Sequence, residues 1–308
     1  MTMLRFILRG ANINKSLMQP CHPELRSSGP AWPPEWLVPD WPAPANVRAV
    51  FTTRQGGIST APWDSMNLGN HVGDTPAHVN ANRALLAQVT GVRSVFLQQV
   101  HGSNVAMLDT QIHAADSDPA DACVATHDRL ACTIMVADCL PVLLCTEDGS
   151  VVAAAHAGWR GLAGGPDGVG VLESVYAAIC ASFRPLPQPR YVPHAMKKIA
   201  WLGPCIGPSA FEVGLEVKTS FEAVQPASAG CFSSVGAGKY LADLPGLARL
   251  RLQALGITQV YGNDGTAPWC TASNPSRFFS HRRDTSNIGR QGNGLRTTGR
   301  MAGVIWRE

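Results

Sequence analysis

Three residues of the chain have side chains suited to metal binding or catalysis and stand in similar local settings. His101, Cys139 and His156 each lie at or just after an apolar stretch, and each has a glycine or a proline within two residues. Polar residues at strand ends, beside glycines that let a ligand approach the backbone, are common in functional sites. The pattern therefore predicts one site that contains two imidazoles and a thiol.

Such a set can perform two kinds of chemistry. Two imidazoles and one thiolate are ligands that suit zinc, and three protein ligands leave a fourth position open, as in catalytic zinc sites. Zinc there would polarise a substrate oxygen or lower the pKa of bound water. Alternatively, Cys139 would attack a carbonyl carbon, with a histidine as its general base. The residue types leave both alternatives open.

Short apolar runs bounded by Gly, Asp or Pro predict the strands that must position these residues. They cover Val47–Thr53, Val95–Gln99, Cys132–Ala137, Pro141–Thr146, Val151–His156 and Ile199–Gly203. Apolar residues at helical spacing predict helices over 77–90, 168–182 and 240–255. Because helices and strands alternate irregularly, we expect an α+β fold with mixed β-sheets flanked by helices.

Composition limits the classes of protein that fit. The chain has 308 residues, of which 45% are apolar and 15% charged, so it can bury a sizeable core. The formal net charge of +3 gives no reason to expect nucleic acid as a partner, and no apolar run approaches the roughly 18 residues of a membrane span. Nine cysteines, an odd number, fit reduced thiols better than a disulfide framework. We therefore expect a soluble, cytoplasmic, globular protein, and make no prediction of its oligomeric state.

The N-terminal segment differs from the rest of the chain. Eight prolines lie between Pro20 and Pro44, and the segment has neither helical nor strand periodicity. Proline fixes φ and removes a hydrogen-bond donor. We therefore expect residues 1–35 to form a flexible Pro-rich extension and residues 36–308 to form one domain.

The chain resembles the YfiH-like laccase-domain family, also called multicopper polyphenol oxidoreductases or purine nucleoside phosphorylases. The resemblance runs from about residue 36 to residue 306. The segments around the three residues carry it, together with Phe51-Thr-Thr-Arg-Gln-Gly-Gly-Ile-Ser59, Met66–Gly69, His71–Asp74, Trp201–Pro208, Phe278–Asp284 and Thr298–Ala302. Two stretches depart from the family pattern: Cys270-Thr-Ala-Ser273 has a single cysteine, and residues 285–297 form an insertion.

The resemblance implies a Cys-His hydrolase-type architecture and a site. It makes His101, Cys139 and His156 the metal-binding or catalytic residues, with one zinc ion, although copper would bind the same ligands. It also implies that Arg54 contacts a substrate anion. The implied activity is phosphorolysis of adenosine, inosine, guanosine and methylthioadenosine, with adenosine deamination as a second activity. The partners would then be a purine nucleoside and phosphate.

Three other functions were compared with this one. A multicopper oxidase takes cluster ligands from His-X-His pairs, and none of the nine histidines forms such a pair, which counts against a copper-dependent polyphenol oxidase (laccase). A Cys-His amidase that edits a peptidoglycan precursor would use Cys139 as nucleophile. A non-enzymatic, zinc-stabilised binding module fits least, because structural zinc sites normally have four protein ligands.

Two further residues beside the site have alternative roles. Asp138 would carry a proton in deamination or, more commonly for such a position, would cap the break between two strands. Arg160 would pair with phosphate or lie on the surface.

Overall fold

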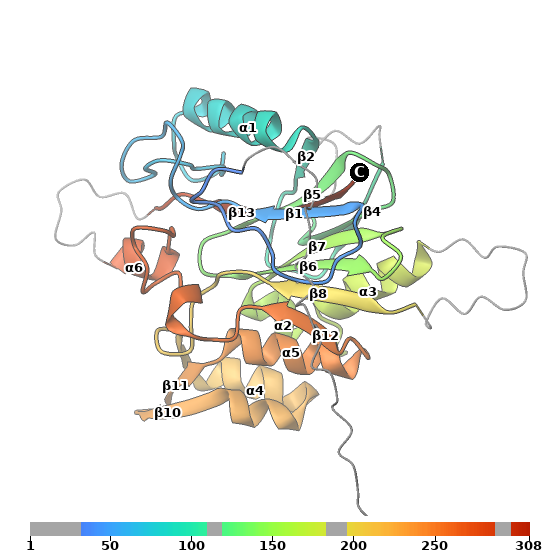
Figure 1. Ribbon diagram of the computed structural model, residues 1–308. Coiled ribbons are helices and arrows are strands. Elements are labelled where there is room, and N and C mark those ends of the chain that lie inside the picture. Colours follow the sequence, from blue (N-terminus) through green and yellow to red (C-terminus); the bar gives the residue numbers. More distant parts are fainter. Residues whose placement is uncertain (1–31, 110–118, 183–195, 287–296) are drawn as a thin grey trace, which may run out of the picture. The chain divides into compact units, whose positions relative to one another are not determined.

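The structure is a computed structural model that describes residues 32–109, 119–182, 196–286 and 297–308. One compact unit spans Trp32–Glu308 (Figure 1). The predicted extension over residues 1–35 lies outside the described residues except for its last four positions. Among these, Trp32 packs edge-on against Trp306, with ring centroids 5.9 Å apart.

A four-stranded sheet forms the first layer of the unit, with α1 (Pro76–Thr90) on its outer side (Figure 1). The order of its strands is β1 (Val47–Phe51), β13 (Met301–Arg307), β5 (Leu130–Val136) and β2 (Arg93–Phe96). Only the pairing of β2 with β5 is parallel. The sheet therefore joins the start, the middle and the end of the described chain.

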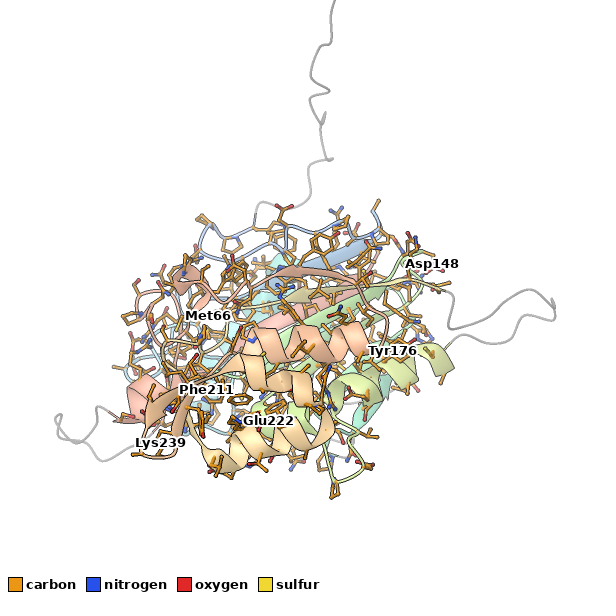
Figure 2. All side chains as sticks on the ribbon, turned by 90° about the horizontal axis from the view of Figure 1, so that it is seen from below. Met66, Asp148, Tyr176, Phe211, Glu222 and Lys239 are labelled. Atoms are coloured by element: carbon orange, nitrogen blue, oxygen red, sulfur yellow. The ribbon has the colours of Figure 1, made fainter. Side chains whose placement is uncertain are left out.

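A six-stranded sheet forms the next layer. Its order is β12 (Gln259–Gly262), β8 (Lys198–Leu202), β6 (Leu140–Thr146), β7 (Val152–Ala157), β4 (Ala122–Ala125) and β3 (Val105–Leu108). The two outermost pairings are parallel and the inner ones antiparallel. The helices α3 (Val171–Ala181), α4 (Leu215–Val224) and α5 (Leu244–Ala254) cover its outer face (Figure 2).

The remaining elements complete this helical side and the surface near it. A small sheet has the order β10 (Phe232–Gly236), β11 (Lys239–Ala242) and β9 (Glu212–Gly214). The short helices are α2 (Trp159–Ala163), α6 (His281–Ser286) and two 3₁₀ turns, η2 (Pro226–Cys231) and η3 (Ala267–Trp269).

The two large sheets pack face to face, which explains the apolar runs in the sequence. Along β5, Cys132 and Ile134 contribute to the core between the sheets, whereas Ala131 and Met135 contribute to the core under α1. A strand that is buried on both faces needs apolar residues at consecutive positions. The layers confirm the predicted α+β class with mixed sheets flanked by helices.

Two predicted elements differ from the observed ones. The expected helix over 240–255 begins only at Leu244, because the Asp243 side chain accepts the Gly246 N–H and caps the helix there. Residues 239–242 before it form β11 instead. The strand expected over Val95–Gln99 ends at Phe96, so His101 lies in a loop and not at a strand end.

The helices and the cysteines bear on two further predictions from the sequence. None of the helices in the described ranges is long and apolar enough to span a membrane. The cysteines in those ranges, eight in all, are free thiols. The insertion at 285–297 lies largely outside the described residues.

Candidate metal and catalytic centre

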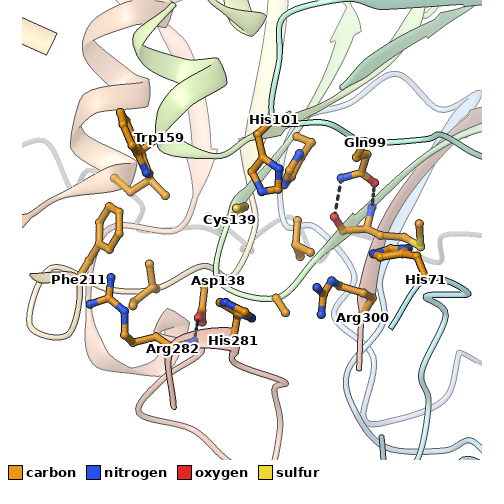
Figure 3. Close-up of a pocket in the computed structure, with 16 residues that line it drawn as sticks. His71, Gln99, His101, Asp138, Cys139, Trp159, Phe211, His281, Arg282 and Arg300 are labelled. Carbon is orange, nitrogen blue, oxygen red and sulfur yellow. Dashed lines mark hydrogen bonds between the residues drawn. The ribbon is translucent and has the colours of Figure 1, made fainter. Parts of the chain in front are cut away.

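The structure brings the three predicted residues together at one end of the space between the two large sheets. The ligand atoms of His101, Cys139 and His156 all lie within 4.8 Å of one another. His156 is on β7, Cys139 is in the connection through which the chain passes from β5 to β6, and His101 is in the loop between β2 and β3. Figure 3 shows the His101 imidazole above Cys139. Their catalytic and metal-binding roles remain predictions.

Asp121, directly before β4, organises the two histidine segments. Its carboxylate accepts the backbone N–H groups of Val100, His101 and Gly102 at 3.1, 2.9 and 2.7 Å. Its Oδ1 also lies 2.8 Å from Nδ1 of the His156 imidazole. His101 has φ of 62°, a left-handed conformation that is uncommon outside glycine. The bonds to Asp121 hold the loop in this conformation, and Nε2 of His156 is left for a ligand.

Gly158 supplies the space that the cluster needs. A Cβ at this position would lie 3.0 Å from Cδ2 of His101 and 3.1 Å from Sγ of Cys139. The imidazoles of His101 and His156 also contact each other edge-on, with centroids 4.7 Å apart. The glycine after the second histidine therefore allows three side chains to meet in one small volume.

The cluster stabilises a thiolate in the absence of a metal ion. Burial alone would raise the pKa of Cys139, but the charge of His156 and hydrogen bonds with both histidines lower it to about 6. Burial alone would lower the pKa of His156, but the Cys139 thiolate and Asp121 raise it to about 9. Near neutral pH, Cys139 and His156 therefore form a thiolate–imidazolium pair.

The three side chains open onto a cavity of about 280 Å³ with two unlike sides (Figure 3). The apolar side is formed by Trp159, Ile206, Phe211 and Leu244. The basic side is formed by His71, His281 and Arg300, whereas the Arg282 guanidinium lies over the Phe211 ring, 5.7 Å from its centroid, beside the apolar side. The apolar side therefore suits a flat apolar ring, and the basic side suits a polar or anionic group.

Asp138 also lines the cavity, but its carboxylate is occupied by the protein. Oδ1 accepts the Thr271 hydroxyl at 2.5 Å, and Oδ2 accepts the Ser280 hydroxyl at 3.1 Å and the Arg282 N–H at 2.6 Å. Its φ of 88° lies at the turn between β5 and β6. These bonds tie the turn to the segment around α6, which corresponds to the structural alternative for this residue.

Arg54 and Arg160 do not reach this cavity. The Arg54 guanidinium donates to the main-chain oxygens of Asp64 and Pro275, both at 2.9 Å, and to Asp64 Oδ2 at 3.1 Å. It lies over the ring of Phe279, 4.8 Å from the centroid. Arg160 is exposed on α2 and lies over Trp159. The role of Arg54 as an anion contact stays a prediction.

Several residues at the site were not identified from the sequence. His71, His281 and Arg300 lie in stretches that match the family pattern. Those matches are the sequence feature that could have identified them as site residues. Asp121 and Phe211 lie outside those stretches. Their places become evident only from pairings between distant segments.

Comparisons with known proteins find similar sequences over most of the chain. Residues 48–308 match the sequence model of the family described as multi-copper polyphenol oxidoreductase laccase. A Pseudomonas aeruginosa protein named purine nucleoside phosphorylase is 43% identical over 277 residues, which are 88% of this chain and 98% of the relative. The Escherichia coli purine nucleoside phosphorylase YfiH is 43% identical over 272 residues, again 88% and 98%.

A solved structure has the same fold. The crystal structure of a Neisseria meningitidis protein assigned to the DUF152 family has a TM-score of 0.73 and 42% identity. The match covers 89% of this chain and 99% of that one. The crystal structure of YlmD from Geobacillus stearothermophilus, at 29% identity, has a TM-score of 0.69 and covers 86% and 93%.

Proposed function

The chain belongs to the multi-copper polyphenol oxidoreductase laccase family, and from that membership we propose that it is a cytoplasmic, zinc-dependent purine nucleoside phosphorylase. Its substrates would be adenosine, inosine, guanosine and methylthioadenosine, with adenosine deamination as a second activity. The observation that carries the proposal is the meeting of His101, Cys139 and His156 at one cavity. Relatives that are 43% identical bear the name purine nucleoside phosphorylase.

The donor set fits a single zinc ion. Two imidazoles and a thiolate with an open fourth position are typical of catalytic zinc, and a carboxylate such as Asp121 behind a histidine is the usual orienting partner. His101, Cys139 and His156 would hold the ion. Bound zinc would supply a Lewis acid beside the cavity that these residues line.

The cavity fits a nucleoside better than a polymer. Its volume of about 280 Å³ is close to the lower limit, about 300 Å³, of the usual range for small-molecule sites. Trp159 and Phe211 give its apolar side two aromatic surfaces for a purine ring. Binding there would orient the nucleoside with its ribose toward the cluster.

The donor set also argues against copper-oxidase chemistry despite the family's name. A multicopper cluster needs more imidazoles than His101 and His156, and the sequence has no His-X-His pair. We therefore place phosphorolysis ahead of polyphenol oxidation for this chain.

One observation favours a second candidate, a Cys-His amidase. Cys139 and His156 form a thiolate–imidazolium pair, which is the activated form of a nucleophilic cysteine. Such an enzyme would attack an amide carbonyl and work without metal.

Metal analysis of the purified protein and product analysis on adenosine, with and without phosphate, test the two candidates. The phosphorylase is expected to contain one zinc per chain and to release adenine only when phosphate is present. It should lose both metal and turnover on Cys139→Ser, because a hydroxyl is a poor zinc ligand. Full phosphorolysis by metal-stripped protein would overturn the zinc requirement, and amide turnover by that protein without phosphorolysis would favour the amidase.

A further inference from the structure

The basic side of the cavity contributes none of the three residues that would hold the metal ion. His71, His281 and Arg300 line it, and Asp138 is the only carboxylate among the described residues that line the cavity. Both Asp138 oxygens accept bonds from the protein, as described above. The negative charges of Asp138 and Cys139 act on Arg300 but accept no hydrogen bond from its guanidinium, so this side of the cavity keeps N–H donors that no described residue satisfies.

Arg300 is held in place by main-chain and side-chain contacts. Its N–H donates to Asn67 Oδ1 at 2.9 Å, and its carbonyl accepts the Leu68 N–H at 3.0 Å. Its Nη1 donates to the main-chain oxygens of Thr298 and Gly299 at 2.9 and 3.2 Å. The guanidinium is thus anchored through one nitrogen, while Nε and Nη2 have no acceptor within the described residues.

Gly69 leaves room for the stem of Arg300. A Cβ on Gly69 would lie 2.7 Å from Cγ of Arg300, closer than side chains pack. Two segments that are more than two hundred residues apart, Asn67–Gly69 and Thr298–Arg300, therefore combine to aim one guanidinium at the cavity.

The groups of the basic side lie close enough to influence one another. Figure 3 shows the Arg300 guanidinium extending toward the imidazole of His281, below Cys139. Burial and then the charge of Arg300 lower the pKa values of both His71 and His281. Arg282 contributes less, because its guanidinium lies over the Phe211 ring, 5.7 Å from the centroid, where its Nη1 donates to the Glu212 carbonyl at 3.0 Å. Arg300 is thus the arginine with the larger effect on both imidazoles, and its Nε and Nη2 have no acceptor within the described residues.

We propose that Arg300, flanked by His281 and His71, binds the phosphate dianion that attacks the nucleoside. This inference rests on the proposed phosphorylase function and names the residue that holds its second substrate. A guanidinium offers two parallel N–H donors that match two phosphate oxygens, and each imidazole adds one donor. A phosphate there would lie beside the metal-ligand cluster and across from the apolar side, where the purine would bind.

This position suits the bonds that change in phosphorolysis. A phosphate oxygen forms a bond to ribose C1′ while the bond from C1′ to N9 of the purine breaks. The electron pair of that bond stays on the base, which takes up the proton that the hydrogen phosphate loses. The products are ribose 1-phosphate and the free base.

The decisive measurement is the phosphate KM of Arg300→Gln in adenine release from adenosine. Loss of a two-bond, charge-assisted contact should raise this KM about 10- to 100-fold. Zinc content, the nucleoside KM and phosphate-free conversion to inosine should change little. Arg300→Lys keeps the charge and should recover part of the loss. Gly69→Ala, which displaces the Arg300 stem, should raise the same KM.

Arg129→Gln is the matched control, because Arg129 is exposed, bonds to the Gly91 carbonyl and does not line the cavity. Arg54→Lys tests the competing assignment, in which Arg54 binds the phosphate. An unchanged phosphate KM in Arg300→Gln, with a raised one in Arg54→Lys, would overturn the proposal. Equal losses of adenine and inosine formation would also overturn it, since Arg300 would then position the nucleoside.

Direct titration separates this inference from the proposed function. Calorimetric titration with inorganic phosphate should show binding to the wild type and weakened binding to Arg300→Gln, even if the protein releases no adenine. In that case the anion site stands and the phosphorylase assignment fails. Adenosine 5′-monophosphate serves as the second probe. If Arg300→Gln weakens its binding but not that of inorganic phosphate, the site recognises the phosphate group of a nucleotide, and the proposal fails.

Discussion

Asp121 connects the two histidines of the site through a single carboxylate. Its Oδ1 lies 2.8 Å from Nδ1 of His156 and accepts the His101 N–H at 2.9 Å, while Oδ2 accepts the neighbouring N–H groups of Val100 and Gly102. Asp121 is fully buried. Burial alone would raise its pKa, but the bonds from His156 and these N–H groups lower it, so the carboxylate is charged at neutral pH. One side chain therefore sets both the imidazole orientation and the loop conformation.

Asp121→Asn is expected to weaken zinc binding about 10- to 100-fold, the usual effect of losing a carboxylate behind a metal-binding histidine. The asparagine side chain would place an NH₂ group where an Asp121 oxygen accepts backbone N–H groups in the wild type, so donor would face donor. Chelator competition measures the affinity, and kcat/KM for adenosine should fall in parallel at limiting zinc. Asp264→Asn is the control, because Asp264 is exposed and bonds only within its own turn. Unchanged affinity in Asp121→Asn would refute the orienting role.

Gly158→Ala tests whether the cluster tolerates a methyl group. The backbone of Gly158, with φ of −66° and ψ of 156°, is open to any residue, so the substitution acts through the new contacts with His101 and Cys139 alone. A displacement of a few tenths of an ångström should lower zinc affinity and kcat/KM by about tenfold. Gly230→Ala is the matched control, because a Cβ there meets nothing within 4 Å. Equal behaviour of the two variants would show that the cluster adapts freely.

Arg54→Lys is expected to destabilise the protein. The Arg54 guanidinium serves three acceptors, two of them main-chain oxygens, and an ammonium cannot reach all three. Loss of one or two of these bonds should cost about 1–3 kcal/mol in the free energy of unfolding, measured by urea denaturation. A rise in the phosphate KM with unchanged stability would instead favour the anion contact that the sequence predicts.

The sequence predicts the central strands well and their neighbours poorly, for a physical reason. Strands such as β5 and β7 are buried on both faces, so their apolar runs are continuous and distinct. The edge strand β10 has only one buried residue, and β11 combines with α5 into what resembles a single helical stripe. Only the helix cap at Asp243 separates β11 from α5.

Some residues of the candidate site can likewise be predicted from the sequence and others cannot. Residue type, with a glycine or proline within two residues, makes His101, Cys139 and His156 candidates, and the family resemblance selects them as a set. Asp121 and Arg300 act through partners that are far away in the sequence, at Val100–Gly102, His156 and Asn67–Gly69. No local pattern indicates such partners, so these roles become evident only from the fold.

The thiolate of Cys139 gives a pH-dependent prediction for metal-stripped protein. The pKa of Cys139 is lowered to about 6. The rate of its alkylation by iodoacetamide should therefore be half-maximal at about pH 6, whereas an ordinary thiol has a pKa of about 8.5. As pH falls through about 6, the thiolate takes up a proton and the rate should fall. Mass spectrometry of the peptide that contains Cys139 measures the rate. A midpoint above about pH 8 would contradict the ion pair.

The same pair should stabilise the metal-free fold within a limited pH range. The lowered pKa of Cys139 gives stability that is lost as pH falls through about 6, and the raised pKa of His156 gives stability that is lost as pH rises through about 9. The difference in Tm between metal-free wild type and Cys139→Ser, which cannot form the pair, should therefore be largest between these values. Differential scanning calorimetry from pH 5 to about 10 measures it. A Tm difference that stays constant across this range would mean that ionisation of Cys139 and His156 is not linked to folding.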